Sequence, residues 1–182
     1  MVLIRPIIAS DAEAVALLHA ESWRSTYAGI LSETYLAGPI FEERLAIWRA
    51  RYLDPNARQV GLLAWLGDEP VGFVYAVGGA HAEHGTLLDN LHVAPAGRGN
   101  GVGTRLLAHL AKELHVRGES DGVYLWAYED NHRTRQYYLR LGAEERERAL
   151  EDAPDGGSVA EWLYTWPSLK VFASHLGVSI EG

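Results

Sequence analysis

The sequence predicts a single α/β domain in which strands and helices alternate along the chain. An apolar run that ends at Val93 is followed by closely spaced glycines and then by apolar residues at helical spacing, which indicates a strand, a tight loop and a helix. Other apolar runs, such as 60–66 and 123–127, have the length of strands. With 182 residues, 48% of them hydrophobic, the chain can bury a substantial core in one domain.

The elements are expected in the following order. They are a strand at 3–7, a helix at 10–19, an amphipathic helix at 41–52, strands at 60–66 and 71–77 joined by a turn, a loop at 78–85, a strand at 86–93, the helix after the glycines, a strand at 123–127, a helix at 133–143, a charged and turn-rich segment at 144–157 and a strand at 159–166. For the helix at 41–52 we predict core packing and no further role.

Composition argues against several classes of partner. Sixteen basic against twenty-four acidic residues give a net charge of -8, whereas nucleic-acid binding requires a basic face. The chain has no cysteine, and His81 and His84 do not have the spacing of a metal motif. No apolar stretch could span a membrane, and the N-terminus lacks a signal-peptide pattern. We therefore expect a cytoplasmic protein without a metal, nucleic-acid partner or membrane partner.

The glycine stretch after the central strand is the most informative part of the sequence. Three alternating glycines, Gly99, Gly101 and Gly103, precede the helix, with Arg98 in front of them and Thr104 in the first turn. The first turn of a helix has unpaired backbone N–H groups and partial positive charge, and glycines let an anion approach the main chain. A simple turn would need fewer glycines, so the stretch predicts a phosphate or pyrophosphate site.

Two common phosphate-binding loops do not fit this stretch. A Walker loop would have Lys after its last glycine, where this chain has Thr104. The dinucleotide fingerprint is spaced G-x-G-x-x-G, whereas the spacing here is G-x-G-x-G. The run Arg98-Gly99-Asn100-Gly101-Val102-Gly103 instead resembles the acyl-CoA loop of the GNAT superfamily of N-acetyltransferases, whose pattern is Gln/Arg-x-x-Gly-x-Gly/Ala after a strand.

A second motif lies further along the chain, after the strand at 123–127. Asn131 follows this strand, and the next helix ends Tyr137-Tyr138-Leu139-Arg140-Leu141-Gly142-Ala143. This resembles the second GNAT signature, in which an Asn precedes a helix that ends with an aromatic residue, Tyr, two residues, Leu-Gly and Phe. Ala143 departs from the usual aromatic residue, which bears on packing more than on chemistry.

The resemblance implies the architecture of the domain. We expect a GNAT fold, with a mixed, mostly antiparallel sheet of six to seven strands flanked by about four helices and splayed between the fourth and fifth strands. The domain would occupy 2–168. Residues 169–182 lie beyond the resemblance and would form an extension that packs on the domain or at a subunit interface.

The resemblance also implies acetyl-CoA as a co-substrate. Its pantetheine arm would pair with the main chain at 91–93, and its pyrophosphate would lie on the loop at 98–104, where Gly101 and Gly103 allow close approach. Arg133 or Arg135 would reach the nucleotide phosphate, although a solvated helix face explains Arg135 better. The expected cofactor-binding residues are Leu91, His92, Val93, Arg98, Gly99, Asn100, Gly101, Val102, Gly103, Thr104, Asn131, Arg133 and Tyr138.

Tyr138 is the candidate general acid, because it occupies the tyrosine position of the family pattern. Its phenol is protonated at neutral pH and could protonate the departing thiolate, with a packing role as an equal alternative. The backbone N–H of Val93 would donate to the tetrahedral oxyanion.

The resemblance makes Asp89 the candidate base, because in many relatives a carboxylate on this strand deprotonates the amine. Its strand parity matches that of Leu91 and Val93, so it should face their side of the sheet, whereas His92 should face the other side. Three further residues remain open as bases: Glu83, His84 and Glu161.

Trp23 and Tyr27 lie one helical turn apart and should share a face. The resemblance implies that they line the acceptor site, because many GNAT proteins have a similar Trp…Tyr-x-Gly segment there, with core packing as the alternative. An apolar or cationic acceptor would suit the aromatic residues Trp23, Tyr27, Trp126, Tyr128 and Trp162, although aromatic residues on strands more often pack in the core. The resemblance thus implies an N-acetyltransferase that acts on a primary amine of a small molecule or a protein by direct transfer. A non-catalytic acyl-CoA-binding module and a nucleotide-binding protein remain alternatives, and the resemblance leaves a homodimer open.

Overall fold

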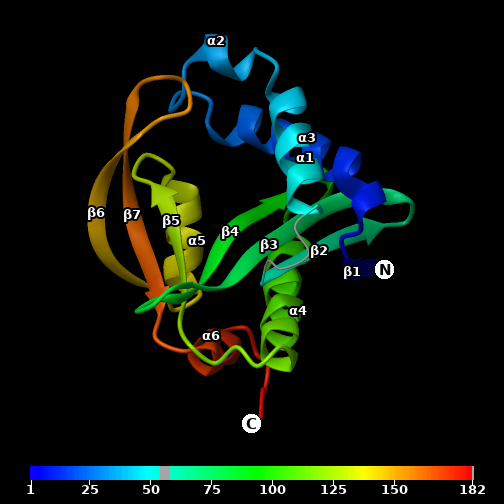
Figure 1. Ribbon diagram of the computed structural model, residues 1–182, viewed down its shortest axis with the longest axis vertical. Coiled ribbons are helices and arrows are strands. Elements are labelled where there is room, and N and C mark those ends of the chain that lie inside the picture. The colour runs from blue at the N-terminus through cyan, green and yellow to red at the C-terminus, as the bar shows by residue number, and fades with distance from the viewer. Residues whose placement is uncertain (54–57, 182) are drawn as a thin grey trace.

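The computed structural model describes residues 1–53 and 58–181. Within them a seven-stranded sheet has the order β1-β2-β3-β4-β5-β7-β6 (Figure 1). The strands are β1 (Val2–Pro6), β2 (Gln59–Leu66), β3 (Glu69–His81), β4 (Gly85–Val93), β5 (Val123–Tyr128), β6 (Glu144–Asp152) and β7 (Ser158–Trp166). The helices are α1 (Ala12–Thr26), α2 (Glu33–Leu36), α3 (Ile40–Arg51), α4 (Val102–Val116), α5 (His132–Arg140) and α6 (Leu169–His175).

The predicted fold class is confirmed. The sheet is mixed and mostly antiparallel, and within the described part of the chain β4 and β5 form the parallel pair. Six α-helices are present in that part, where about four were expected. The excess comes from α2 and α6, which are too short to give a clear helical period.

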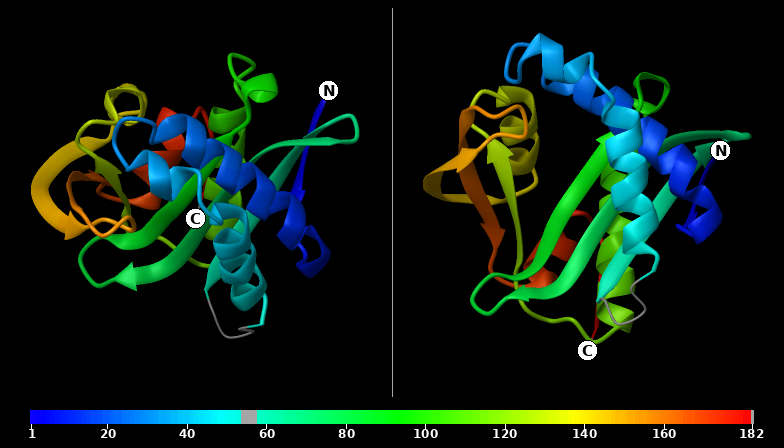
Figure 2. Two further views of the ribbon diagram at one scale, coloured as in Figure 1. Left: turned by 90° about the horizontal axis from the view of Figure 1, so that it is seen from above. Right: turned by 45° about the horizontal axis from the view of Figure 1, so that its top comes forward.

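Helices cover both faces of the sheet, as the two views of Figure 2 show. On one face, α1 and α3 bury Val15 and Trp48 against Phe73 and Tyr75 of β3. On the other face, α4 buries a stripe of leucines against β2, β3 and β5. The stripe recurs at helical spacing, as the sequence predicts: Leu106, Leu107, Leu110 and Leu114.

The sheet opens between β4 and β5. These strands pair only at Thr86↔Val123 and Leu87↔Tyr124 within the described residues, and beyond that point they diverge (Figure 2). The expected splay between the fourth and fifth strands is therefore present. Parallel strands need a crossover connection, and α4 supplies it. The carboxyl end of β4 and the N-terminus of α4 consequently lie beside the opening.

β6 is the strand that sequence analysis missed. Its sequence is Glu-Glu-Arg-Glu-Arg-Ala-Leu-Glu-Asp, and nearly all of its residues are exposed. It pairs with β7 at the end of the sheet, where a charged strand discourages pairing with another chain. The periodicity of a half-buried strand is absent there, so the pattern indicated only a charged segment.

The helices of the described residues include none that is both long and apolar enough to cross a membrane.

The C-terminal helix α6 packs on the domain. Leu169, Phe172 and Ala173 are buried, and the Phe172 ring lies 4.9 Å from the ring of Trp166 on β7. We expect Phe172→Ala to lower the free energy of unfolding by about 3–5 kcal/mol, as for large-to-small changes in other cores. Urea denaturation measures this, with Lys170→Ala on the exposed side of α6 as the control. A loss below about 1 kcal/mol would show that α6 adds little to the core.

Candidate active site

A cavity of about 940 Å³ lies at the opening between β4 and β5. Its walls come from β4, β5, the loop before α4 and α5, and also from α1 and α3 across the sheet. The structure brings together all but one of the site residues predicted from the sequence: Trp23, Tyr27, Asp89, Leu91, His92, Val93, Arg98, Gly99, Gly101, Val102, Gly103, Thr104, Asn131, Arg133 and Tyr138 line this cavity. Asn100 is exposed and lies outside the lining.

The glycine loop forms one end of the cavity. Gly99 and Gly101 have positive φ angles of 77° and 69°, a conformation that side chains disfavour. Gly101 is the residue before α4, a helix of 15 residues, and a Cβ built on it would meet nothing within 4 Å. The first-turn N–H groups of α4 therefore lie beside open space, as an anion site requires.

Gly103 has a different structural role from Gly101. A Cβ on Gly103 would lie 3.2 Å from the hydroxyl oxygen of Tyr137, whose hydroxyl is also 3.3 Å from Thr104 Oγ1. The glycine thus lets α4 approach α5 closely. Sequence analysis explained Gly103 by access for an anion, and the packing against Tyr137 is a reason that only the structure shows.

The expectation about the side chain of Asp89 is wrong, because β4 contains a β-bulge. The register of β3 and β4 shifts between Tyr75↔Asn90 and Ala76↔Leu88, so Asp89 is the extra residue. Asp89 and Asn90 both reach Arg51 on α3, on the face opposite to Leu91. Strict alternation of side chains fails at such a bulge.

Arg51 connects α3 to this bulge. Its guanidinium donates to Asp89 Oδ2 at 2.5 Å and to Asn90 Oδ1 at 2.9 Å, and it lies 4.1 Å from the centroid of the Tyr75 ring. The carboxylate of Asp89 therefore lines the cavity as one partner of an ion pair with Arg51.

The end of β4 directs main-chain groups into the opening. The N–H of Ala94 donates to the Val71 carbonyl on β3 at 2.9 Å, so the main-chain groups of the preceding residue, Val93, point away from β3. The Val93 carbonyl accepts a hydrogen bond of 3.1 Å from Arg98 Nε, which agrees with this direction. Leu91 has the same parity and points the same way.

Arg98 was expected to contribute charge to the phosphate site. In the structure its side chain folds back onto Val93 and reaches Ser25 Oγ at 3.4 Å. Arg98 thus fixes the loop against β4 and α1 while it lines the cavity.

Tyr138 lies deep in the cavity wall. It is 5% exposed, and its ring centroid is 5.3 Å from that of Tyr137 and 6.1 Å from that of Trp166. Burial raises the pKa of the Tyr138 phenol, and the neighbouring Tyr137 raises it further. The hydroxyl therefore stays protonated across the neutral range, as a general acid needs.

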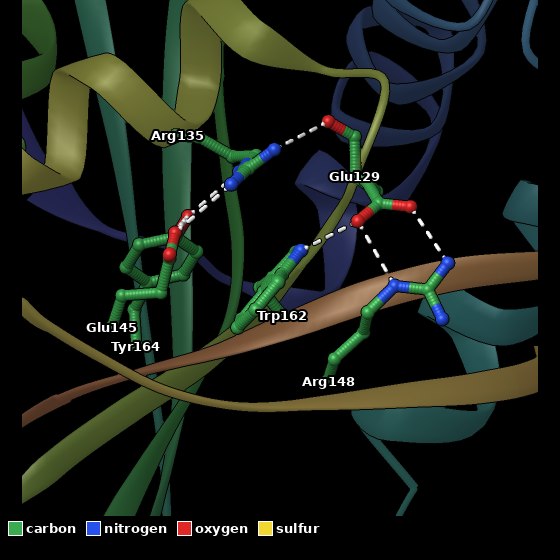
Figure 3. Close-up of polar contacts among 6 residues, drawn as sticks. All are labelled: Glu129, Arg135, Glu145, Arg148, Trp162 and Tyr164. Carbon is green, nitrogen blue, oxygen red and sulfur yellow. Dashed lines mark hydrogen bonds and ion pairs between the residues drawn. The ribbon is translucent and has the colours of Figure 1, made fainter.

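The start of α5 is fixed by Asn131 and by a polar network. The Asn131 side chain caps α5 by accepting from the Thr134 N–H at 3.3 Å. Arg135 donates to the Glu129 carbonyl, to the Tyr164 hydroxyl and to Glu145, as Figure 3 shows. Arg135 is thus held within the fold, whereas Arg133 is exposed and lines the cavity.

Glu129 is the centre of the same network in Figure 3. Hydrogen bonds from Arg148 and Trp162 hold the pKa of its carboxyl at about 2. The charged group links β6, β7 and the turn after β5, and it thereby positions the wall of the cavity that carries Asn131.

Two histidines, His19 and His92, line the cavity beside α1. His92 Nδ1 is 2.7 Å from Ser22 Oγ, and the His92 ring centroid is 4.8 Å from that of His19. Burial, with a smaller effect from the positive charge of Arg44, lowers the pKa of His92 to about 4. His92 is consequently neutral at pH 7. Its ring packs on Phe73 and faces away from Leu91 and Val93, as expected. Because of the bulge, Asp89 shares this face with it.

The α1 side of the cavity carries an aromatic row, which we define as Trp23, Tyr27 and Tyr128. Ring centroids are 5.1 Å apart between Trp23 and Tyr27 and 5.0 Å apart between Tyr27 and Tyr128. The guanidinium of Arg44 lies 4.3 Å from the centroid of Trp23. Sequence analysis missed Arg44 and Arg51, because α3 showed only the pattern of a packing helix.

Comparison with known proteins agrees with this geometry. Residues 18–143 match the model of the Acetyltransferase (GNAT) family. No curated protein matches the sequence.

Solved structures with similar folds include two that were determined with a bound cofactor. The PaiA N-acetyltransferase from Thermoplasma acidophilum, in complex with coenzyme A, is 24% identical with a TM-score of 0.70, over 89% of this chain and 98% of that one. YncA from Salmonella typhimurium, with its cofactor acetyl-CoA, is 18% identical with a TM-score of 0.64, over 92% and 94%. An aminoglycoside 6'-acetyltransferase type Ii is 22% identical with a TM-score of 0.63, over 91% and 96%. At these identities the similarity establishes the fold.

Proposed function

Because the chain belongs to the GNAT acetyltransferase family, we propose that it transfers the acetyl group of acetyl-CoA directly to a primary amine in a ternary complex. The observation that carries the proposal is one continuous cavity at the opening of the sheet. It extends from the glycine loop on one side to the aromatic row on the other. An acyl donor and an acceptor that enter from opposite sides would meet beside Val93 and Tyr138.

The donor would bind along the opening. Its pyrophosphate would lie on the backbone from 98 to 104, where the N-terminus of α4 is free of side chains at Gly101. Its pantetheine arm would pair with the outward main-chain groups of Leu91 and Val93. The structures of PaiA with coenzyme A and of YncA with acetyl-CoA support this choice of donor.

The reaction then requires three groups from the protein. The neutral amine attacks the thioester carbon, and the backbone N–H of Val93 stabilises the resulting oxyanion. The carbon–sulfur bond breaks, and Tyr138 donates its proton to the departing thiolate. A base accepts the proton that the amine loses, so that the products are the acetylated amine and free CoA.

Asp89 remains the proposed base, now with Arg51 as its partner. We expect Asp89→Asn to lower kcat by about 10²-fold while the dissociation constant of acetyl-CoA stays within a factor of about three, because general-base catalysis contributes that much. Steady-state kinetics and calorimetry measure the two quantities.

The matched variant is Arg51→Gln, which breaks the same ion pair but keeps the carboxylate. If Asp89 is the base, the Arg51→Gln variant should retain much more activity than the Asp89→Asn variant. Equal losses would show that Asp89 acts only by holding Arg51, and Glu161 or His92 would then be tested as the base.

The proposed function is tested by amine-dependent release of CoA thiol, with the acetylated product identified by its mass. Release that requires both acetyl-CoA and an amine supports the proposal. Saturable binding of acetyl-CoA without transfer to any amine would favour the alternative of a non-catalytic acyl-CoA-binding module. Preference for a nicotinamide dinucleotide over CoA would contradict both.

A further inference from the structure

We propose that the acceptor is an amine that also carries a carboxylate, as an amino acid does, and that Arg44 binds this carboxylate. The inference rests on the proposed function and names the substrate class of the same cavity. It replaces the expectation of an apolar or cationic acceptor that the aromatic residues suggested.

Arg44 is a largely buried cation with unused hydrogen-bonding capacity. Its side chain is 12% exposed and lines the cavity, and its Nε has no hydrogen-bond partner among the described residues. One terminal nitrogen lies 3.5 Å from Glu43 Oε2, an oxygen that also accepts from the Tyr35 hydroxyl at 3.0 Å. A buried guanidinium is costly unless an anion with good geometry compensates it.

Arg51 provides a comparison on the same helix. It also lines the cavity, but the fold neutralises it through Asp89 at 2.5 Å and through a hydrogen bond to Asn90 at 2.9 Å. The Glu43 side chain is 41% exposed and lies 3.5 Å from Arg44, farther than Asp89 lies from Arg51, so it compensates less. The charge that remains available to a ligand on this wall is therefore that of Arg44.

The position of Arg44 also argues against a cationic acceptor at the aromatic row. Its guanidinium covers one face of the Trp23 ring at 4.3 Å, so this face is not available to an acceptor cation. Its positive charge also acts on the cavity, since it contributes to the lowered pKa of His92. A second cation beside Trp23 would be repelled, whereas an anion would be attracted.

The opposite end of the aromatic row suits an amine. Glu161 on β7 pairs in register with Tyr128 and lines the cavity. Burial raises the pKa of the Glu161 carboxyl, with a further contribution from Glu151. The acceptor side thus has a cation beside Trp23 and a carboxyl group beside Tyr128. This arrangement is complementary to a molecule with an anionic and an amino end.

Matched acceptor pairs test the inference. Each pair consists of an amino acid and the amine left after removal of its carboxyl group, for example phenylalanine with phenethylamine, and the set includes α-, β- and γ-amino acids. In wild type we expect kcat/KM for the best amino acid to exceed that of its partner by about 30-fold or more, the effect of one desolvated charge pair.

Variants of Arg44 test whether this residue causes the preference for the amino acid. Arg44→Gln should raise KM for the amino acid by about 30-fold or more and change the partner amine by less than about three-fold. Arg44→Lys should restore part of the loss, because it keeps the charge without the planar fork. The control is Arg49→Gln, which removes the same charge from an exposed position of α3 and should leave the preference intact. Equal rates within the pairs, or a preference that survives Arg44→Gln, would overturn the inference.

A binding measurement separates this inference from the proposed function. The CoA-loaded protein is titrated with N-acetyl amino acids and with the N-acetyl derivatives of the partner amines. Tighter binding of the carboxylates that is lost in Arg44→Gln supports the inference even if no amine is acetylated, in which case the proposed function alone fails. Binding of the carboxylates that is absent, or no tighter than that of their partners, overturns the inference even where transfer occurs.

Discussion

Tyr138→Phe is expected to lower kcat for amine acetylation by about 10²–10⁴-fold, the range of general acid catalysis. The substitution removes only the phenolic oxygen from a side chain that is 5% exposed and packed against Tyr137 and Trp166. The thiolate would then have to leave without a proton donor. Because the ring remains, the dissociation constant of acetyl-CoA should change by less than about three-fold.

A matched control for this variant is Tyr124→Phe. Tyr124 is also buried on β5, but it packs against His81 and His84 and lies outside the cavity lining. Loss of the Tyr124 hydroxyl should leave kcat near the wild-type value. Near-normal kcat in Tyr138→Phe would show that Tyr138 only packs the core and does not act as the general acid.

Gly101→Val is expected to weaken acetyl-CoA binding by about 100-fold or more. The added side chain would occupy the space beside the first turn of α4, where the pyrophosphate must approach the main chain. It would also strain a backbone with a φ angle of 69°. Calorimetric titration with CoA measures the affinity, and urea denaturation measures the strain.

Gly177→Val separates the two effects. Gly177 has the same φ angle of 69°, and a Cβ on it also meets nothing within 4 Å, but it follows α6, away from the cavity. This variant should lose stability without losing affinity for CoA. If Gly101→Val binds CoA as well as Gly177→Val does, the glycine loop is not the pyrophosphate site.

The parts of the site that the sequence predicts are those formed by short, continuous motifs. The glycines at 99–103 and the Tyr137-Tyr138 pair act through local backbone conformation and position on one helix, so their spacing along the chain is informative. The splay of the sheet followed from the family resemblance, because strand order depends on contacts between distant segments.

Three features could not be predicted, each for a physical reason. The bulge at Asp89 depends on the register of β3 against β4, which strict side-chain alternation does not reveal. β6 is charged and exposed, so it has no apolar period. Arg44 contacts Trp23 and Arg51 pairs with Asp89 only because α3 packs over Trp23 and over the bulge. In the sequence, both residues look like the charged residues of any amphipathic helix.

The most direct test of the central claim is a crystal structure of the protein with acetyl-CoA. The account requires the pyrophosphate to lie on the backbone at 98–104 and the pantetheine arm to lie between β4 and β5. The thioester carbonyl should accept from the Val93 N–H, and its sulfur should lie within hydrogen-bonding reach of the Tyr138 hydroxyl. A cofactor bound outside this opening, or a thioester distant from both groups, would contradict the proposed site and mechanism.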